Sequence, residues 1–484
     1  VVPYQYNLRK RQADPRRIHQ SKLNCAMSST LPSSTPMPLA GLCTHEQAAV
    51  VGVSVDATVM RLRRYVYVKA QSLQLMASRF NEMPDWEVKG AFALHLWQDA
   101  EHGTGFRRRV TEMRTPPHHL DKMPDPALGA FLAELGLARN PLEVLVALYE
   151  VLKPACLEAF NAHLAQSNPI ADYPTRRFLQ FTIGEEEAQI AWGQNALAAL
   201  REAGVSSKDE KSLRAWRDHL RAFLESAGGI NGDGVGVRPS APASRGVAAE
   251  VSQVPRRDRR FERVWRSRGV VPATDRSLHE RVWWMMNVRL QEMHVAELIA
   301  SVIAEWRDQP WDFYHDLARH LWDETRHCML GEVAFAGQRI PFFSVPSHVG
   351  FAEYPNTQLA PPERYAFLWG IEQGLMTKTG KQAEVALAKA GGDLLATNFQ
   401  DFDWADEVLH AQIGRKWLEP HYKTREAMLE VYERIRPAYD QIKEDDLRLP
   451  GRDWWPAFYA QHLKDKDPRP HEHGDGSEQP AATY

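Results

Sequence analysis

Apolar residues recur at intervals of three and four along two long stretches of the chain, residues 43–225 and 257–462. This spacing is that of an amphipathic α-helix, which buries one face and exposes the other. Neither stretch shows the sustained alternation of β-branched residues that predicts strands. The pattern therefore predicts an all-α protein with two helical parts and few strands.

The segments outside these stretches have a different composition. Residues 226–256 are rich in Gly, Pro, Ser and Ala, which predicts a flexible linker. Residues 1–42, which open with a basic run, and the polar residues 463–484 are predicted to be a disordered arm and a disordered tail. The sequence begins with Val, and Met27 would serve as a native start. The basic run is therefore either a targeting segment or no part of the native protein.

The two helical stretches resemble each other. HLWQDAEH at 95–102 matches HLWDETRH at 320–327, and LMAS at 75–78 matches LIAS at 298–301. A Trp precedes each His-Leu-Trp triplet by nine residues. We therefore predict a tandem duplication of one helical unit of roughly 200 residues.

Polar residues interrupt the apolar faces of the second half. In a helix predicted over 277–307, Glu292 falls between Val288 and Val295 on the apolar stripe. A carboxylate at such a place is costly unless it is paired or binds metal. In the next helix, predicted over 311–336, Glu324 and His327 are three apart and share a face. Glu292 and Glu324 lie at similar distances from the intervening turn, so an antiparallel hairpin brings them to one level.

Two further helices complete the set. A long irregular connection, predicted over 337–361, leads to a helix that carries Glu372 on its apolar face. The last helix carries Glu407 and His410, again three apart. Four carboxylates and two imidazoles suit two iron or manganese ions with open positions for dioxygen, whereas a Cys-rich set would favour zinc. Each residue alone would more often be part of a solvated face, so the prediction depends on the set of six.

The motifs QEMHVAEL, DETRH, IEQGLMTKTG and DEVLHAQIG-x-x-W, between residues 283 and 418, resemble in order those of a bacterial ferritin-like family of unknown function, within the non-haem di-iron carboxylate superfamily. The resemblance implies tandem ferritin-like four-helix bundles, the second of which binds metal. It places the metal ligands at Glu292, Glu324, His327, Glu372, Glu407 and His410. It also implies that Glu297 assists the metal or a proton transfer.

The resemblance also predicts how the two His side chains are oriented. The chain departs from the family pattern in two respects. In related sites the Asp before each ligand Glu holds the His of the opposite helix, so Asp323 is expected to orient His410, and Asp406 to orient His327. The chain departs from the family by having Gln291 where a His is usual. It also carries an additional amino-terminal unit.

The first half carries an altered set of the same residues. Aligning the repeats places Lys69 opposite Glu292 and Glu150 near Glu372. The remaining positions are Asp99, His102, Glu186 and Gln189. A Lys could neutralise carboxylates in place of metal, so we expect a degenerate, metal-free scaffold, pocket wall or built-in dimer partner. The alternative is a single-metal site of Asp99, His102, Glu150 and Glu186.

The expected function is that of an oxidoreductase that activates O2 with two iron ions, or with manganese and iron. It would act on a small organic molecule as a hydroxylase or N-oxygenase. No flavin, haem or iron–sulfur motif is visible, so electrons would come from an external donor or from the substrate. The alternatives are a ferroxidase or other metal-handling protein, and a non-catalytic helical scaffold.

Composition and charge limit the classes of partner that we expect the protein to bind. The net charge is −3 and charges of both signs are interspersed, which gives no case for nucleic acid or an anionic membrane. The four Cys form no Cys-x-x-Cys pair, so we expect a reducing, cytoplasmic setting without a disulfide framework. No run is apolar enough to span a bilayer. The protein is expected to act as a homodimer or as an intramolecular pseudo-dimer.

Overall fold

A computed structural model describes residues 37–114, 120–204, 206–233, 238–248 and 250–466. The predictions for residues 1–36 and 467–484 lie outside this part. The chain divides into two units, Val1–Val50 and Val51–Tyr484. The first unit contains a short 3-10 turn, Leu39–Gly41, and helix α1, His45–Ala48, which the side chain of Thr44 caps. Both predicted halves fall within the second unit.

The first half of this unit is helical throughout its regular structure. Its elements are α2 (Val55–Arg79), η2 (Phe80–Glu82), α3 (Trp86–Thr111), α4 (Pro126–Leu135), α5 (Pro141–Val146), a π-helical turn η3 (Ala147–Leu152), α6 (Lys153–Gln166), α7 (Tyr173–Glu202) and α8 (Ser207–Ser226). Helix α2 starts where the Ser54 hydroxyl accepts a hydrogen bond from the backbone N–H of Ala57 (3.2 Å).

The second half is also predominantly helical. Its elements are β1 (Val264–Trp265), α9 (Leu278–Leu290), α10 (Met293–Glu305), α11 (Trp311–Gly337), η4 (Phe342–Ser344), β2 (Ser347–His348), α12 (Gly350–Gln358), α13 (Pro361–Leu375), α14 (Lys381–Gly391), α15 (Leu394–Tyr422), α16 (Arg425–Leu447), α17 (Trp455–His462) and η5 (Lys464–Lys466). The two short strands pair in parallel. The predictions of an all-α class and of few strands are confirmed. Among the described residues, no helix has both the length and the apolarity needed to cross a membrane.

Two predicted elements of the second half were wrong in part. The single helix predicted over 277–307 is broken between α9 and α10, because the N–H groups of Gln291 and Glu292 bond three residues back, to Val288 and Arg289 (3.0 Å each). Such tightened turns often mark functional positions in helices. The connection predicted to be irregular over 337–361 contains the helical turn η4, strand β2 and helix α12.

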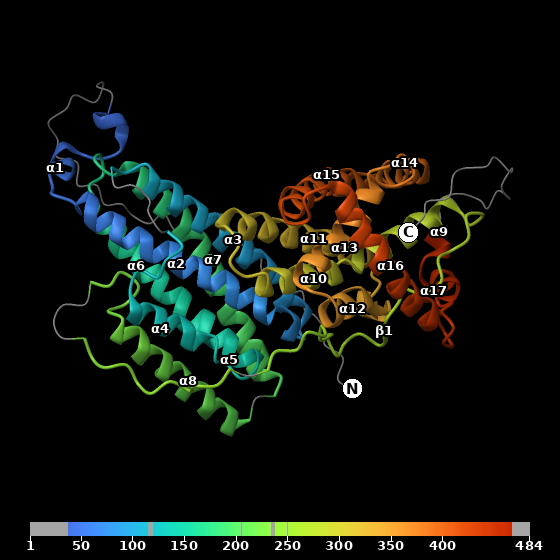
Figure 1. The fold of residues 1–484 in the computed structure, drawn as a ribbon, viewed down its shortest axis with the longest axis horizontal. Helices are drawn as coiled ribbons and strands as arrows, with labels where there is room; N and C mark the ends of the chain where they lie inside the picture. Colours follow the sequence, from blue (N-terminus) through green and yellow to red (C-terminus); the bar gives the residue numbers. More distant parts are fainter. Residues whose placement is uncertain (1–36, 115–119, 205, 234–237, 249, 467–484) are drawn as a thin grey trace. The chain divides into compact units, whose positions relative to one another are not determined.

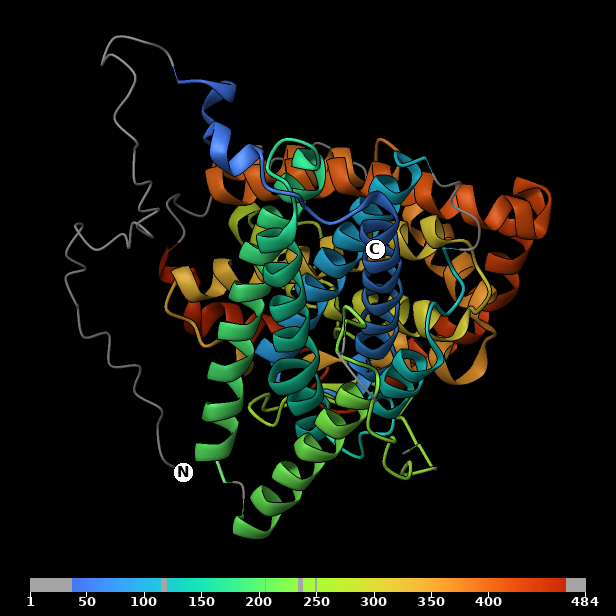
Figure 2. The same ribbon diagram turned by 90° about the vertical axis from the view of Figure 1, so that its left-hand side faces the viewer.

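Helices of the two halves pack directly on each other. Helix α11 lies along α3, and α10 lies along α2 (Figure 1, Figure 2). Trp97 and Trp322, the third residues of the two His-Leu-Trp triplets, stack with ring centroids 6.2 Å apart and nearly parallel planes. The indole N–H of Trp86 bonds to Glu332 (3.0 Å), and that of Trp311 bonds to Thr104 (2.8 Å). Trp97 and Trp322, which match in the sequence alignment, thus stack on each other, and Trp86 and Trp311, which also match, each donate a hydrogen bond across the same interface.

The predicted linker, residues 226–256, lacks strands and helices in its described residues beyond the end of α8. It is nevertheless anchored to the first half. Arg245 forms an ion pair with buried Glu143 (2.6 Å) and lies over the Trp216 ring, 3.8 Å from its centroid. Buried Arg64 donates to the backbone carbonyl of Gly229 (2.9 Å). These contacts fix the course of the segment along the helices.

The helices that carry polar residues approach closely at two glycines. A Cβ on Gly331 of α11 would lie 2.3 Å from the backbone N of Leu290, and a Cβ on Gly414 of α15 would lie 2.4 Å from the Trp369 ring. Trp369 also donates from its indole N–H to the Ala411 carbonyl (3.2 Å). Small residues therefore set the spacing between α11 and α9 and between α15 and α13.

We expect Gly331→Ala to destabilise the protein by about 1–3 kcal/mol or more, because the neighbouring atoms are backbone and cannot give way. The measurement is the shift in thermal unfolding. The control is Gly184→Ala in α7, where an added Cβ meets nothing within 4 Å. That change should stabilise by up to about 1 kcal/mol through helix propensity alone. Equal shifts for the two variants would contradict the close approach.

Candidate metal centre

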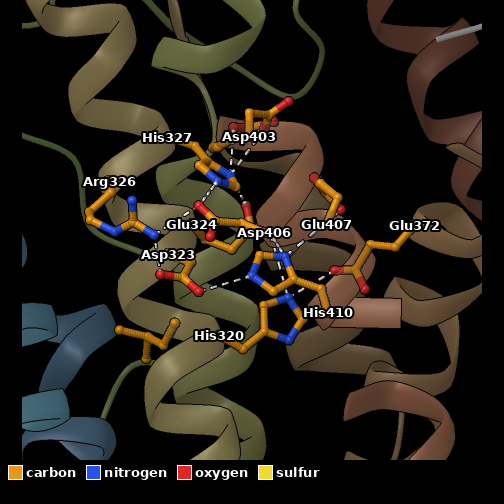
Figure 3. A network of polar contacts seen from close by, with 12 residues as sticks. His320, Asp323, Glu324, Arg326, His327, Glu372, Asp403, Asp406, Glu407 and His410 are labelled. Atoms are coloured by element: carbon orange, nitrogen blue, oxygen red, sulfur yellow. Dashed lines mark hydrogen bonds and ion pairs between the residues drawn. The ribbon is translucent and has the colours of Figure 1, made fainter. Parts of the chain in front are cut away.

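Glu324 of α11 lies at the centre of a cluster of buried carboxylates and imidazoles (Figure 3). Its Oε2 is 3.7 Å from Nδ1 of His327, one turn along the same helix. Its Oε1 is 3.2 Å from Nδ1 of His410, which comes from α15. One carboxylate thus presents an oxygen to each of two imidazoles, as a ligand shared by two ions would.

The Nε2 atom of each imidazole, on the side of the ring away from Glu324, lies within hydrogen-bond distance of an Asp on the opposite helix. His410 Nε2 lies 3.4 Å from Asp323 Oδ2, and His327 Nε2 lies 3.2 Å from Asp406 Oδ2. An N–H donated at Nε2 directs Nδ1 into the cluster, where that nitrogen can bind metal once it has lost its proton. The predicted exchange of partners between the two Asp-Glu-x-x-His motifs is therefore confirmed by the geometry.

The other three predicted ligands also reach the cluster. Glu292, in the tight turn between α9 and α10, has Oε2 3.6 Å from His327 Nδ1. Glu407 of α15 has Oε2 3.8 Å from His410 Nδ1, and it also groups with Glu324 and His327 within 4.8 Å. Glu372 of α13 groups with Glu324 and His410 within the same limit. The structure thus brings the six predicted residues together from four segments.

Two further candidate ligands were missed. His320, four residues before Glu324 on the same face of α11, lies 2.9 Å from Glu372 Oε1 and stacks on His410 with ring centroids 3.9 Å apart. Its position in the repeated His-Leu-Trp triplet was a usable signal. Asp403 of α15 has Oδ1 3.3 Å from His327 Nδ1. Asp403 precedes Glu407 by one helical turn, and only this spacing pointed to it.

Two buried cations at the edge of the cluster were also missed. Lys381, the first residue of α14, has Nζ 2.8 Å from Asp403 Oδ2 and 3.0 Å from Glu407 Oε1. Arg289 of α9 donates to Asp403 and lies 2.9 Å from Glu292 Oε1. No regularity of the sequence pointed to these contacts, because α9 and α14 meet α15 only through tertiary packing.

The cluster carries more negative than positive charge. Six buried carboxylates face two buried cations. The carboxylates are Glu292, Glu324, Glu372, Glu384, Asp403 and Glu407, and the cations are Arg289 and Lys381. With neutral imidazoles the excess is four negative charges, which two divalent ions would balance. An uncompensated excess of this size is very costly in a protein interior.

The pKa values show how the side chains share this charge. Burial raises the pKa of Glu292 to about 8, although the charges of Arg289 and Lys381 oppose this rise. Burial would also raise the pKa of Glu324, but the imidazoles of His320, His327 and His410 around it hold that pKa well below its usual value. Burial would lower the pKa of His327, but the neighbouring Asp403 and Asp406 raise it to about 10. In the metal-free cluster, protonated imidazoles therefore offset part of the excess negative charge.

The unpartnered atoms of the cluster support a metal rather than an internal hydrogen-bond network. Five inward-facing atoms are buried and have no hydrogen-bond partner. They are Glu292 Oε2, His327 Nδ1, Glu372 Oε2, Glu407 Oε2 and His410 Nδ1. Such atoms are rare in proteins unless an ion, water or ligand completes them. Metal bonds of about 2.1 Å place neighbouring ligand atoms roughly 3–3.5 Å apart, which is close to the separations described above. The donor set therefore fits two divalent ions.

Glu297, predicted to assist the metal, lies elsewhere. Its fully buried carboxylate pairs with Lys89 of α3 and with Arg257, and its backbone carbonyl accepts from Asn81 (3.2 Å). The side chain thus faces the first half. The proposed assistance to the metal gains no support, because Glu297 follows Glu292 by more than one helical turn and turns away from the cluster.

In the first half, two lysines form ion pairs with the carboxylates of the corresponding cluster. Lys69 Nζ contacts Asp99 Oδ1 (2.7 Å) and Glu186, as the repeat alignment suggested. Lys153 Nζ lies 3.1 Å from both oxygens of Asp99. Asp99, His102 and Glu186 could together hold an ion, but their two carboxylates already face two ammonium groups. His102 instead bonds through Nε2 to Glu185 (2.7 Å).

Glu150, aligned with Glu372, was placed wrongly. Its carboxylate lies 2.8 Å from Arg201, away from Asp99 and Glu186. Glu150 belongs to the π-helical turn Ala147–Leu152, which changes the direction of its side chain relative to a regular helix. Pro154 follows this turn, and its missing N–H leaves the carbonyl of Glu150 without the usual helical donor. The alternative single-metal site therefore lacks one of its four residues.

A comparison of this chain with protein-family models, curated proteins and solved structures finds no match.

Proposed function

We propose that the second half holds two divalent metal ions, iron or a manganese–iron pair, and that the protein is an O2-activating oxidoreductase acting on a small organic molecule. The observation that carries this proposal is the position of Glu324. Its two oxygens face two imidazole nitrogens that are buried, unpartnered and held from behind by Asp323 and Asp406. Both nitrogens are within ion-pair distance of Glu324, yet neither forms a hydrogen bond of normal geometry, as an ordinary buried His–Glu pair would.

The chain's own residues would perform three tasks. The side chains that would hold the two ions are Glu292, Glu324, His327, Glu372, Glu407 and His410. Asp323 and Asp406 would keep both imidazoles in the tautomer that binds metal. The buried surroundings would exclude water, which strengthens every electrostatic interaction in the centre. When bound, the ions would supply the redox chemistry with dioxygen, which amino-acid side chains alone do not provide.

We also propose that the two halves arose by duplication of a ferritin-like bundle and form an intramolecular pseudo-dimer. A two-fold interface brings equivalent residues together and repeats each contact in reverse. The Trp97–Trp322 stack supports this relation, because the two residues hold equivalent places in the repeats. So does the pair of contacts in which Trp86 reaches Glu332 and Trp311 lies 5.3 Å from the Arg107 guanidinium. The first half would then be the metal-free partner.

Metal analysis of the purified chain tests the central proposal. After anaerobic reconstitution with ferrous iron and removal of excess, we expect about two ions per chain, the stoichiometry of ferritin-like di-iron sites. A chain that binds no metal under these conditions would overturn the proposal. Uptake of many ions per chain as a mineral would favour storage instead.

Metal affinity should rise with pH. In the metal-free protein, His327 with a pKa near 10 and Glu292 with a pKa near 8 both hold protons at neutral pH. An incoming ion must displace these protons, so binding releases them and weakens as the solution becomes more acidic. Titration calorimetry with Mn2+ in buffers of different ionisation enthalpy measures the protons released. Affinity that stays constant between about pH 6 and 8 would contradict this protonation pattern.

A further inference from the structure

We propose that the two metal positions are unequal: the position at His320 and His410 fills first and tightly, and Lys381 weakens the position at His327. This inference rests on the proposed function, since it assigns properties to the same centre. It adds His320 and Asp403 to the ligands and gives Lys381 a role.

At the position of His320 and His410, the candidate ligand atoms contact one another, as in the 2.9 Å contact between His320 Nε2 and Glu372 Oε1. One possible ligand atom from each of His320, Glu324, Glu372 and His410 lies within 4.8 Å of those of the other three. Within the described part of the chain, none of these four side chains forms an ion pair with Lys or Arg. Two imidazoles and two carboxylates make a favourable set for a divalent first-row metal.

At the position of His327, by contrast, Lys and Arg side chains contact the candidate ligands. Its candidate ligands are Glu292, His327 and Asp403, which also lie within 4.8 Å of one another. Here the carboxylates are already engaged: Arg289 contacts both Glu292 and Asp403, and Lys381 contacts Asp403. An ion entering this position must compete with bound N–H donors and meets like charge at short range. The position also has one imidazole instead of two.

Lys381, which weakens metal binding at the His327 position, also contacts the candidate ligand Glu407. Its Nζ lies 3.0 Å from Glu407 Oε1, while Glu407 Oε2 faces His410. The ammonium thus contacts one oxygen of a carboxylate whose other oxygen faces the other position. Three buried carboxylates, those of Glu384, Asp403 and Glu407, lie within 4.0 Å of this ammonium group and stabilise its charged form. A permanent cation at one end of the centre makes the two ends chemically different.

Titration of the metal-free protein with Co2+ under anaerobic conditions tests the proposal, followed by calorimetry and by visible absorption of the bound ion. The wild-type chain should bind two ions in two steps whose dissociation constants differ by at least about tenfold. Lys381→Met should tighten the second step by about tenfold and leave the first unchanged, because it removes the competing charge. His320→Phe should weaken the first step by about 10–100-fold, as loss of a ligand contact does.

The control is Lys416→Met. Lys416 lies on α15, like the ligands, but its side chain is half exposed and pairs with Asp316 (2.6 Å). This change should alter neither step. Two equal steps in the wild-type chain, or a second step that weakens or stays the same in Lys381→Met, would overturn the inequality and leave the two-metal proposal standing. Failure of the wild-type chain to bind any Co2+ would instead overturn the proposed function. The wild-type titration decides between these outcomes even if a variant fails to fold.

Discussion

Glu324→Gln should remove the ability to hold two metal ions and abolish oxygen uptake. The substitution keeps the size of the side chain but removes the charge that faces both His327 and His410. Loss of one shared anionic ligand affects both positions, so we expect affinity to fall by about 100-fold or more at the centre. The measurements are metal content after dialysis and oxygen consumption in the presence of a reductant. Retention of two ions in this variant would contradict the central position of Glu324.

A matched pair of variants locates the activity in one half. His410→Ala should abolish oxygen uptake in the same way, since it removes an imidazole that faces Glu324. Gln189→Ala changes the residue that the repeat alignment places opposite His410. Gln189 donates to Gln98 (2.8 Å) in the first half, so its loss should leave metal content and oxygen uptake unchanged. The reverse result would move the centre to the first half.

Lys69→Met should destabilise the protein by about 3–5 kcal/mol at neutral pH, because it leaves buried carboxylates short of one counter-charge. Lys69, Asp99 and Glu186 are each at most 1% exposed, so solvent cannot screen the loss. Chemical denaturation measures the effect. Lys416→Met is again the control, since exposed ion pairs contribute no more than about 1 kcal/mol.

The effect of Lys69→Met should depend on pH in a definite direction. Burial would raise the pKa of Asp99 and of Glu186, but Lys153 and Lys69 hold both below their usual values in the folded state. The stability that they contribute is therefore present above their unfolded pKa, near 4, and is lost as the pH falls. The difference between variant and wild type should be largest at neutral pH and should shrink in acid. A loss independent of pH would indicate that packing, not charge, is responsible.

The helical class and the grouping of six polar residues could be predicted because both depend on local spacing. A Glu and a His three apart share a helical face wherever the helix packs, and the relation between the two motifs also placed Asp323 and Asp406 correctly. His320 could have been added by the same rule, since it precedes Glu324 by four residues.

The remaining features depend on tertiary packing or on local irregularity. Lys381 and Arg289 reach the cluster from helices whose placement no periodicity specifies. The break at Glu292 and the π-helical turn at Glu150 each alter the register of a side chain within an otherwise regular helix. One irregular turn is enough to direct a side chain out of a predicted site, as Glu150 shows.

The ion pair between Glu297 and Lys89 has a consequence for the modularity of the protein. Glu297 is fully buried in the second half, and one of its two cationic partners belongs to the first. A chain that begins at residue 257 would keep Arg257 but lose Lys89, and the apolar surfaces beneath α2 and α3 would be exposed. The two halves therefore are not interchangeable parts. Separation of the second half from the first would call for a compensating change at position 297.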